Sequence, residues 1–113
     1  MPLNDALNNL EATIQSIVRD YPLTEMKLLS ILPVNEGEEY KQTVYIRTNE
    51  KIQNWNNAYQ ELASAYMQVD FVSVFDSLID QEGQLKKEYT TDGLHLSVTG
   101  YQVLTKALKD YLL

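Results

Sequence analysis

The sequence predicts an α/β fold of the doubly wound class, with helices packed on a parallel sheet. Two short apolar runs do not alternate with polar residues, and three segments with helical periodicity surround them. The resulting order is helix, strand, helix, strand, helix. Buried strands that alternate with helices form right-handed crossovers and a parallel sheet. We therefore expect residues 1–113 to form a single, partial domain.

The first predicted helix runs from about Asn4 to Asp20 and ends before Pro22, which cannot continue a helix. Its apolar residues alternate in spacings of four and three, which places them on one face. They are Leu3, Leu7, Leu10, Ile14, Ile17 and Tyr21. A coiled-coil seam has the same spacing, but this pattern lasts less than three heptads, so an ordinary core face is favoured.

The two apolar runs, residues 27–32 and 71–75, are the predicted strands. Because neither alternates, each is expected to be covered on both faces, and the β-branched and aromatic content of the second favours strand over helix. Two strands make a very small sheet, and the free edge of the first leaves unpaired amides and carbonyls. We expect this edge to pair with a second copy of the chain or with a missing amino-terminal half.

Two further helices follow polar loops at residues 35–42 and 80–93. Thr48 or Asn49 is the expected N-cap of the first, and Ser97 that of the second. Their apolar stripes are Ile52, Trp55, Tyr59, Leu62 and Tyr66, and then Tyr101, Leu104, Leu108 and Tyr111. We interpret these aromatic residues as packing residues rather than as a stacking platform.

The composition excludes several function classes. A net charge of −7 with only nine scattered Lys and Arg argues against nucleic-acid binding. The absence of cysteine excludes disulfides, thiolate catalysis and cysteine-ligated metals. No apolar run is long enough to span a membrane, and the first residues lack the pattern of a signal peptide. We therefore expect a cytoplasmic protein without a cofactor.

The strongest chemical signal is Asp92 followed three residues later by His95, the single histidine, just before the last helix. In a serine hydrolase an imidazole takes the serine proton, and a carboxylate orients the ring and stabilises the imidazolium. Gly93 permits the tight turn that this pairing needs. Two residues are too few for a zinc site. A lone histidine in a polar loop is more often a solvated side chain, so the flanking sequence must decide.

That flanking sequence resembles the carboxyl-terminal Asp-x-x-His block of the GDSL (SGNH) hydrolases, especially bacterial members similar to platelet-activating factor acetylhydrolase. The residues that carry the resemblance are Asp92, Gly93, Leu94, His95, Ser97, Gly100, Tyr101 and Leu104. The resemblance implies a flavodoxin-like, three-layer α/β/α lipase or acylhydrolase in which Asp92 orients His95 and His95 is the general base. It also implies that this chain is the carboxyl-terminal half, so the Gly-Asp-Ser nucleophile and the oxyanion hole lie outside it.

Two other features admit plainer interpretations. Phe75-Asp76-Ser77-Leu78 differs from Gly-Asp-Ser-Leu by one residue, but it follows the last strand and lacks the glycine. We therefore reject Ser77 as a nucleophile and interpret the segment as a turn. The acidic residues Glu36, Glu38 and Glu39 are interpreted as a solvated loop, although the loop after this strand could border a substrate cleft.

The sequence thus predicts part of an esterase that hydrolyses small acyl or acetyl esters through a Ser-His-Asp triad. Because the serine is expected elsewhere, we expect the isolated chain to be inactive. The rival hypothesis is a non-catalytic α/β interaction module, or a truncated remnant, that associates with itself. The expected partners are a small-molecule ester in the complete enzyme and no nucleic acid.

Overall fold

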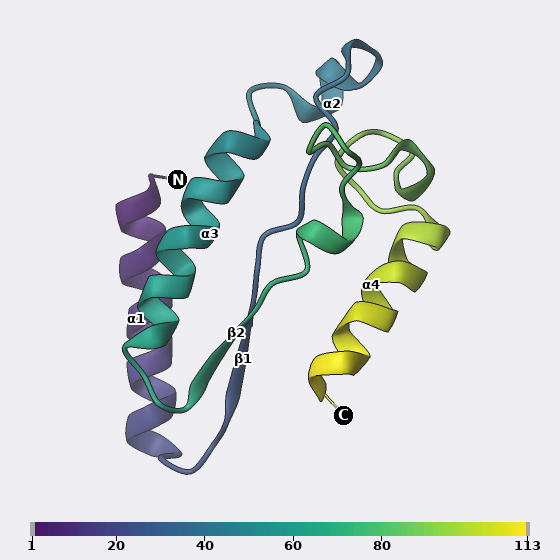
Figure 1. The fold of residues 1–113 in the computed structure, drawn as a ribbon. Coiled ribbons are helices and arrows are strands. Elements are labelled where there is room, and N and C mark those ends of the chain that lie inside the picture. The colour runs from purple at the N-terminus through teal and green to yellow at the C-terminus, as the bar shows by residue number, and fades with distance from the viewer. Residues whose placement is uncertain (1, 113) are drawn as a thin grey trace.

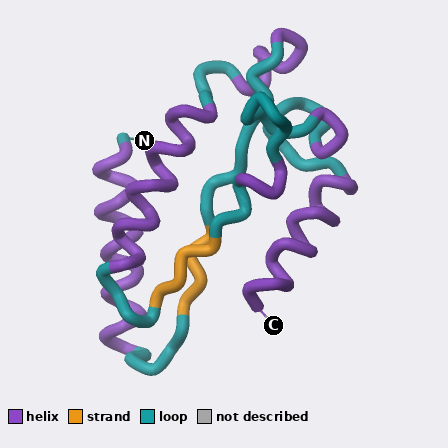
Figure 2. Tube along the Cα trace, viewed as in Figure 1, coloured by secondary structure: helices purple, strands orange, loops and turns teal. Residues whose placement is uncertain are grey.

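The structure, a computed structural model that describes residues 2–112, has the predicted order of helix, strand, helix, strand and helix, with one additional short helix after the first strand (Figures 1 and 2). The helices are α1 (Leu3–Asp20), the short α2 (Lys41–Val44), α3 (Asn49–Ser64) and α4 (Val98–Leu112). The strands are β1 (Met26–Leu29) and β2 (Val69–Val72). Three single 3₁₀ turns complete the chain: η1 (Glu38–Tyr40), η2 (Asp76–Leu78) and η3 (Lys87–Tyr89).

The two strands are parallel, with Met26 opposite Val69 and Leu29 opposite Val72. Figure 1 shows α1 and α3 side by side along one side of the strands and α4 on the other side. α3 packs on β2 and α1 packs on α3 around Ile14, Ala63 and Val69. The middle of the predicted stripe on α1, at Leu10 and Ile14, is therefore a core face within this chain, whereas its last member, Tyr21, is 66% exposed.

The prediction that both strands are covered on both faces is wrong for the part of the chain that the structure describes. In β1 the exposure alternates, and Lys27 and Leu29 are exposed, Leu29 at 39%. The Lys27 ammonium lies 2.6 Å from the carboxylate of Asp70, its exposed neighbour on β2. The reason is the position of α4, which packs on η2 and η3 rather than on the strands. Pairing of the free β1 edge with another chain stays a prediction.

The strands are also shorter than their apolar runs, because side chains take over the pairing beyond Leu29. The Ser30 amide still donates to the Val72 carbonyl oxygen at 2.9 Å. The amide of Val74 then donates to the Ser30 hydroxyl oxygen at 3.0 Å instead of to a backbone carbonyl. The ladder therefore ends at a buried serine.

Two buried asparagines of α3 hold the segment that follows β1. The Asn56 side chain accepts from the Ile31 amide at 2.7 Å and donates to the Ile31 carbonyl at 3.1 Å. The Asn49 side chain makes the same two bonds with Val34, at 2.8 Å and 2.7 Å. A buried backbone group without a partner costs about 1–3 kcal/mol, so these side-chain amides supply the partners that a neighbouring strand would otherwise provide. The two asparagines thereby hold residues 31–34 in place, and these residues lead to Asn35, which contacts the turn of the candidate site.

The helix caps match the sequence, and the inner face of α4 matches it in part. Thr48 caps α3 by accepting from the Lys51 amide at 3.2 Å, and Ser97 accepts from the Gly100 amide at 3.1 Å. Leu104 and Leu108 are half-buried, whereas Tyr101 and Tyr111, predicted to pack, are exposed at 56% and 47%. The buried Gly100 lets α4 approach the backbone of η3 closely, so the adjacent Tyr101 points away from that contact. Tyr111 keeps a contact with the strand end, because its hydroxyl donates to the Ser73 carbonyl at 3.3 Å. Within residues 2–112, none of the helices has the length and apolar content that a bilayer span requires.

Candidate active site

A tight turn between η3 and α4 brings Asp92 and His95 together. Thr90 and Leu96 form an isolated antiparallel bridge at its base. Gly93 has a φ of +84°, in the left-handed region that glycine adopts without the steric cost of a Cβ. The glycine at position 93 therefore fits the backbone conformation that this turn requires.

Asp92 uses both carboxylate oxygens within this turn. Its Oδ1 accepts from the backbone amides of His95 at 2.7 Å and Leu94 at 2.9 Å. Its Oδ2 lies 2.6 Å from Nδ1 of His95. The hydrogen bond from the imidazole, reinforced by the two backbone amides, lowers the pKa of the Asp92 carboxyl to about 2. The carboxylate is therefore ionised at neutral pH and faces the ring.

The His95 ring presents its second nitrogen to solvent. Its side chain is 70% exposed, and Nε2 has no hydrogen bond to any residue from 2 to 112. A neutral imidazole whose Nδ1 donates to a carboxylate carries its lone pair on Nε2. The tautomer that the hydrogen bond favours therefore exposes a proton acceptor.

The loop that follows β1 packs directly against this turn. The Asn35 amide donates to the Gly93 carbonyl at 2.9 Å. A Cβ on Gly93 would lie 2.5 Å from Tyr40 Cβ and 3.0 Å from the Asn35 carbonyl oxygen. The buried Asn35 side chain in turn donates to the Leu85 carbonyl at 2.7 Å. Gly93 is thus required twice, for its φ and for the close approach of this loop.

The sequence profile of the GDSL-like lipase/acylhydrolase family matches residues 1–103, which include the whole turn. The chain belongs to this family. The predicted family and the α/β fold class are both confirmed. No curated protein matches the chain.

Solved structures share this GDSL-like fold. A Streptococcus pneumonia protein provisionally described as a platelet activating factor is 80% identical over 100% of this chain, with a TM-score of 0.97. A provisionally described acylhydrolase from Bacteroides fragilis (18% identity, TM-score 0.76) and a GDSL-like lipase from Bacteroides thetaiotaomicron (22%, 0.70) each match 97% of it. The latter two show the fold alone. The chain spans about half of each structure, 53%, 51% and 52% of their lengths in the order given.

An apolar cavity of about 490 Å³ opens beside the turn of this GDSL-family chain. Leu94, which stands between Asp92 and His95, lines it together with residues after β1 and residues at the start of α3. Trp55 also lines the cavity, while its ring packs at a tilt against Tyr59 with 6.3 Å between centroids. Trp55 is therefore a packing residue, as predicted, that also borders open space near the site.

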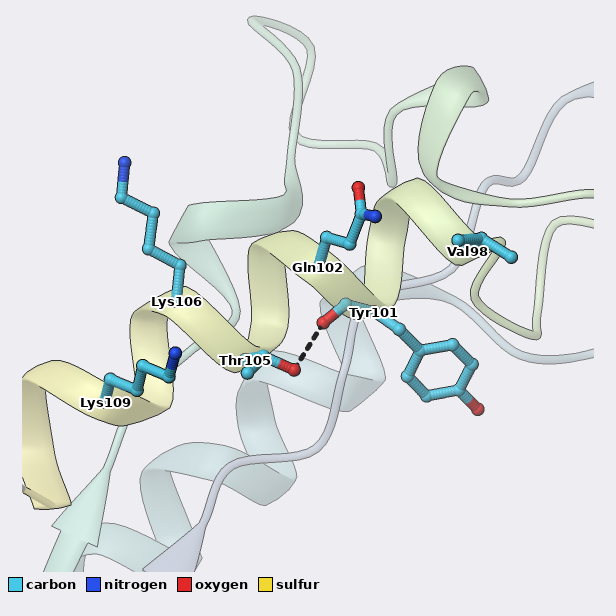
Figure 3. Close-up of a pocket in the computed structure, with 6 residues that line it drawn as sticks. All are labelled: Val98, Tyr101, Gln102, Thr105, Lys106 and Lys109. Atoms are coloured by element: carbon cyan, nitrogen blue, oxygen red, sulfur yellow. Dashed lines mark hydrogen bonds between the residues drawn. The ribbon is translucent and has the colours of Figure 1, made fainter.

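A second hollow, of about 600 Å³, has no connection to Asp92 or His95 through its lining. Figure 3 shows that all of its residues belong to the exposed side of α4. They are Val98, Tyr101, Gln102, Thr105, Lys106 and Lys109. The single hydrogen bond drawn among them, from the Thr105 hydroxyl to the Tyr101 carbonyl at 2.8 Å, is internal to the helix. We therefore place the candidate site at the turn rather than on α4.

Glu36, Glu38 and Glu39 are exposed, in agreement with a solvated loop, but each also has a polar partner within the chain. Glu36 Oε2 accepts from the Asn49 side chain at 3.3 Å and from Gln84 at 3.1 Å. Glu38 and Glu39 form exposed ion pairs with lysines. Among residues 2–112, no three His, Cys, Asp or Glu side chains gather as metal ligands. Glu36 therefore acts structurally, by joining this loop to α3 and to the loop of residues 80–93.

Ser77 lies exposed in η2, the turn that the sequence predicts. η2 packs on α4. Its exclusion as a nucleophile stays a prediction.

The low pKa of Asp92 predicts a turn that resists moderate acid. Because the folded-state pKa of about 2 lies below the ordinary value of 3.8, the ionised carboxylate favours the folded turn fully above the ordinary value. This contribution is lost as the pH falls from 3.8 through about 2. We expect the backbone amide resonances of Leu94 and His95 to change in acid with a midpoint near that lower value in an NMR titration. A midpoint at the ordinary value, or the same transition in Asp92→Asn, would contradict the assignment.

Proposed function

We propose that this chain supplies the general base, His95, and its orienting carboxylate, Asp92, to the Ser-His-Asp triad of an esterase of the GDSL family. The observation that carries the proposal is the 2.6 Å contact between Asp92 Oδ2 and His95 Nδ1, combined with an exposed Nε2. A ring held in this way has the tautomer and the access that a base acting on a serine hydroxyl needs. The substrates we propose are small acyl or acetyl esters.

In the proposed reaction, His95 Nε2 takes the proton of the serine hydroxyl as the serine oxygen attacks the ester carbonyl. The imidazolium, stabilised by Asp92, then gives this proton to the departing alkoxide, and an acyl-serine remains. Water then attacks the acyl carbon while His95 takes a proton from it, the bond between the acyl carbon and the serine oxygen breaks, and His95 returns the proton to the serine as the carboxylic acid leaves. Asp92 stays ionised throughout, in keeping with its pKa of about 2.

We propose that the serine lies outside these 113 residues. Ser97, the serine nearest to His95 in the sequence, is already used as a helix cap and donates to the Glu88 carbonyl at 2.9 Å. Ser30 accepts from Val74 in the interior. Among residues 2–112 no serine is hydrogen-bonded to the His95 ring, whose one side-chain partner is Asp92.

The test is a chimera in which this chain replaces the matching 53% of the Streptococcus pneumonia relative, to which it is 80% identical. We expect the chimera to hydrolyse a short-chain nitrophenyl ester that the relative itself hydrolyses. The isolated chain should show no turnover above its His95→Ala variant.

Two outcomes contradict the proposal. Turnover by the isolated chain that His95→Ala abolishes would return Ser77 to consideration. A folded but inactive chimera beside an active relative would favour the rival hypothesis, a non-catalytic interaction module.

A further inference from the structure

We infer that Thr90 is a positioning residue of the Asp92–His95 pair, a role whose effect on turnover rests on the function proposed above. The Thr90 side chain is buried, with 6% of the residue exposed. Its hydroxyl donates to the His95 carbonyl at 2.6 Å and accepts from the Gly93 amide at 2.9 Å. Both partners lie in the turn itself, one on the residue that carries the imidazole and the other next to the carboxylate.

The bond from Gly93 completes the hydrogen bonding of three consecutive backbone amides. The Gly93 amide donates to Thr90, whereas those of Leu94 and His95 donate to Asp92 Oδ1. The carboxylate thus fixes the backbone that follows it, and the threonine fixes the start and the end of the same turn. Without the hydroxyl, the buried Gly93 amide and the His95 carbonyl both lose this partner. The backbone of the turn can then change conformation and move the His95 ring away from the Asp92 carboxylate.

The backbone and the side chain of Thr90 are both restrained, which fixes the direction of its hydroxyl. Its backbone pairs with Leu96 in the isolated bridge, so the main chain on both sides of the turn is held before the side chain acts. A β-branched residue has a restricted χ1, which keeps the hydroxyl pointed into the turn. The other side of Gly93 is closed by the Asn35 amide and the Tyr40 side chain. The Thr90 hydrogen bonds therefore restrain the side of the turn that Asn35 and Tyr40 do not contact.

The matched variants are Thr90→Val, which keeps the shape and removes the hydroxyl, and Thr90→Ser, which keeps the hydroxyl. The chain has a single histidine, so its low-field Nδ1–H resonance is assigned without ambiguity. In Thr90→Val we expect this resonance to broaden and the Asp92 pKa, followed through its carboxyl carbon, to rise from about 2 toward 3.8. Thr90→Ser should retain both signals. In the chimera, Thr90→Val should lower kcat by about 10²-fold with little change in KM, as expected for a misplaced catalytic group.

The NMR measurements use the isolated chain and do not depend on turnover. If the chimera proves inactive, the proposed function fails while the role of Thr90 in the pair is still decided by the resonance and the carboxyl titration. Retention of both signals in a folded Thr90→Val variant would overturn the inference. If Thr90→Val does not fold by circular dichroism, Thr90→Ala replaces it against Thr90→Ser. Loss of folding in Thr90→Ser as well would assign the residue to general stability and would also overturn the inference.

Discussion

Replacing His95 with alanine in the chimera is expected to lower kcat/KM for the nitrophenyl ester by about 10⁴- to 10⁶-fold. The serine hydroxyl then has no base to take its proton, and the departing alkoxide has no acid. Because the ring is 70% exposed and, among residues 2–112, is bonded only to Asp92, its removal should leave the fold intact. Steady-state kinetics measure the loss, and circular dichroism verifies the fold.

A matched control is Arg19→Ala, which removes another exposed, ion-paired side chain from α1. An exposed pair of this kind contributes little to stability, and the variant should keep full activity. Added imidazole should restore part of the lost turnover in His95→Ala, since the vacated position opens to solvent. Turnover that survives in His95→Ala would show that another residue is the base.

Local signals in the sequence were sufficient to predict the Asp92–His95 turn. The two residues lie three positions apart, and the glycine between them has the positive φ that the turn needs. The same holds for the caps Thr48 and Ser97, whose partners lie three residues away. Interactions of this range can be inferred from spacing because the backbone geometry fixes them.

The residues that hold the site in place could not be predicted in this way. Asn56 bonds the backbone of Ile31, 25 residues earlier, and Asn35 bonds the Leu85 carbonyl, 50 residues later. Each asparagine interrupts an apolar pattern or lies in a polar loop, so periodicity alone assigns it to solvent. Thr90 has short-range partners, but its burial, with 6% of the residue exposed, is a tertiary property that spacing does not give. A buried asparagine side chain can bond both the backbone amide and the backbone carbonyl of one residue, as Asn56 does with Ile31. The helix or strand propensity of a single residue contains no information about such a long-range pair.

The errors about exposure have the same origin. The apolar run at β1 predicted cover on both faces, yet Leu29 is 39% exposed because α4 packs at the level of η2 and η3. Tyr101 is exposed because the preceding residue, Gly100, is the one that approaches η3, whereas Tyr111 bonds the Ser73 carbonyl and is still 47% exposed. Hydrophobic spacing identifies an apolar face, but the elements that the helix contacts decide which members of that face are buried.

Replacing Asp92 with asparagine should separate the orientation of the ring from the shape of the turn. The amide oxygen can still accept from the backbone amides of Leu94 and His95, at the positions now 2.9 Å and 2.7 Å from Oδ1. The amide nitrogen then takes the place of Oδ2 and donates to His95 Nδ1. The ring proton consequently moves to Nε2, which can no longer accept a proton from serine.

For Asp92→Asn in the chimera we expect a fall in kcat of about 10⁴-fold, the size found when a triad carboxylate loses its charge but keeps its shape. The low-field Nδ1–H resonance should disappear, whereas the Leu94 and His95 amides should stay protected from hydrogen exchange. Asp92→Ala, which removes the acceptor as well, should lose that protection. If Asp92→Asn kept its turnover, the 2.6 Å contact would be a feature of the turn alone, since a base in the wrong tautomer has no lone pair to offer the serine.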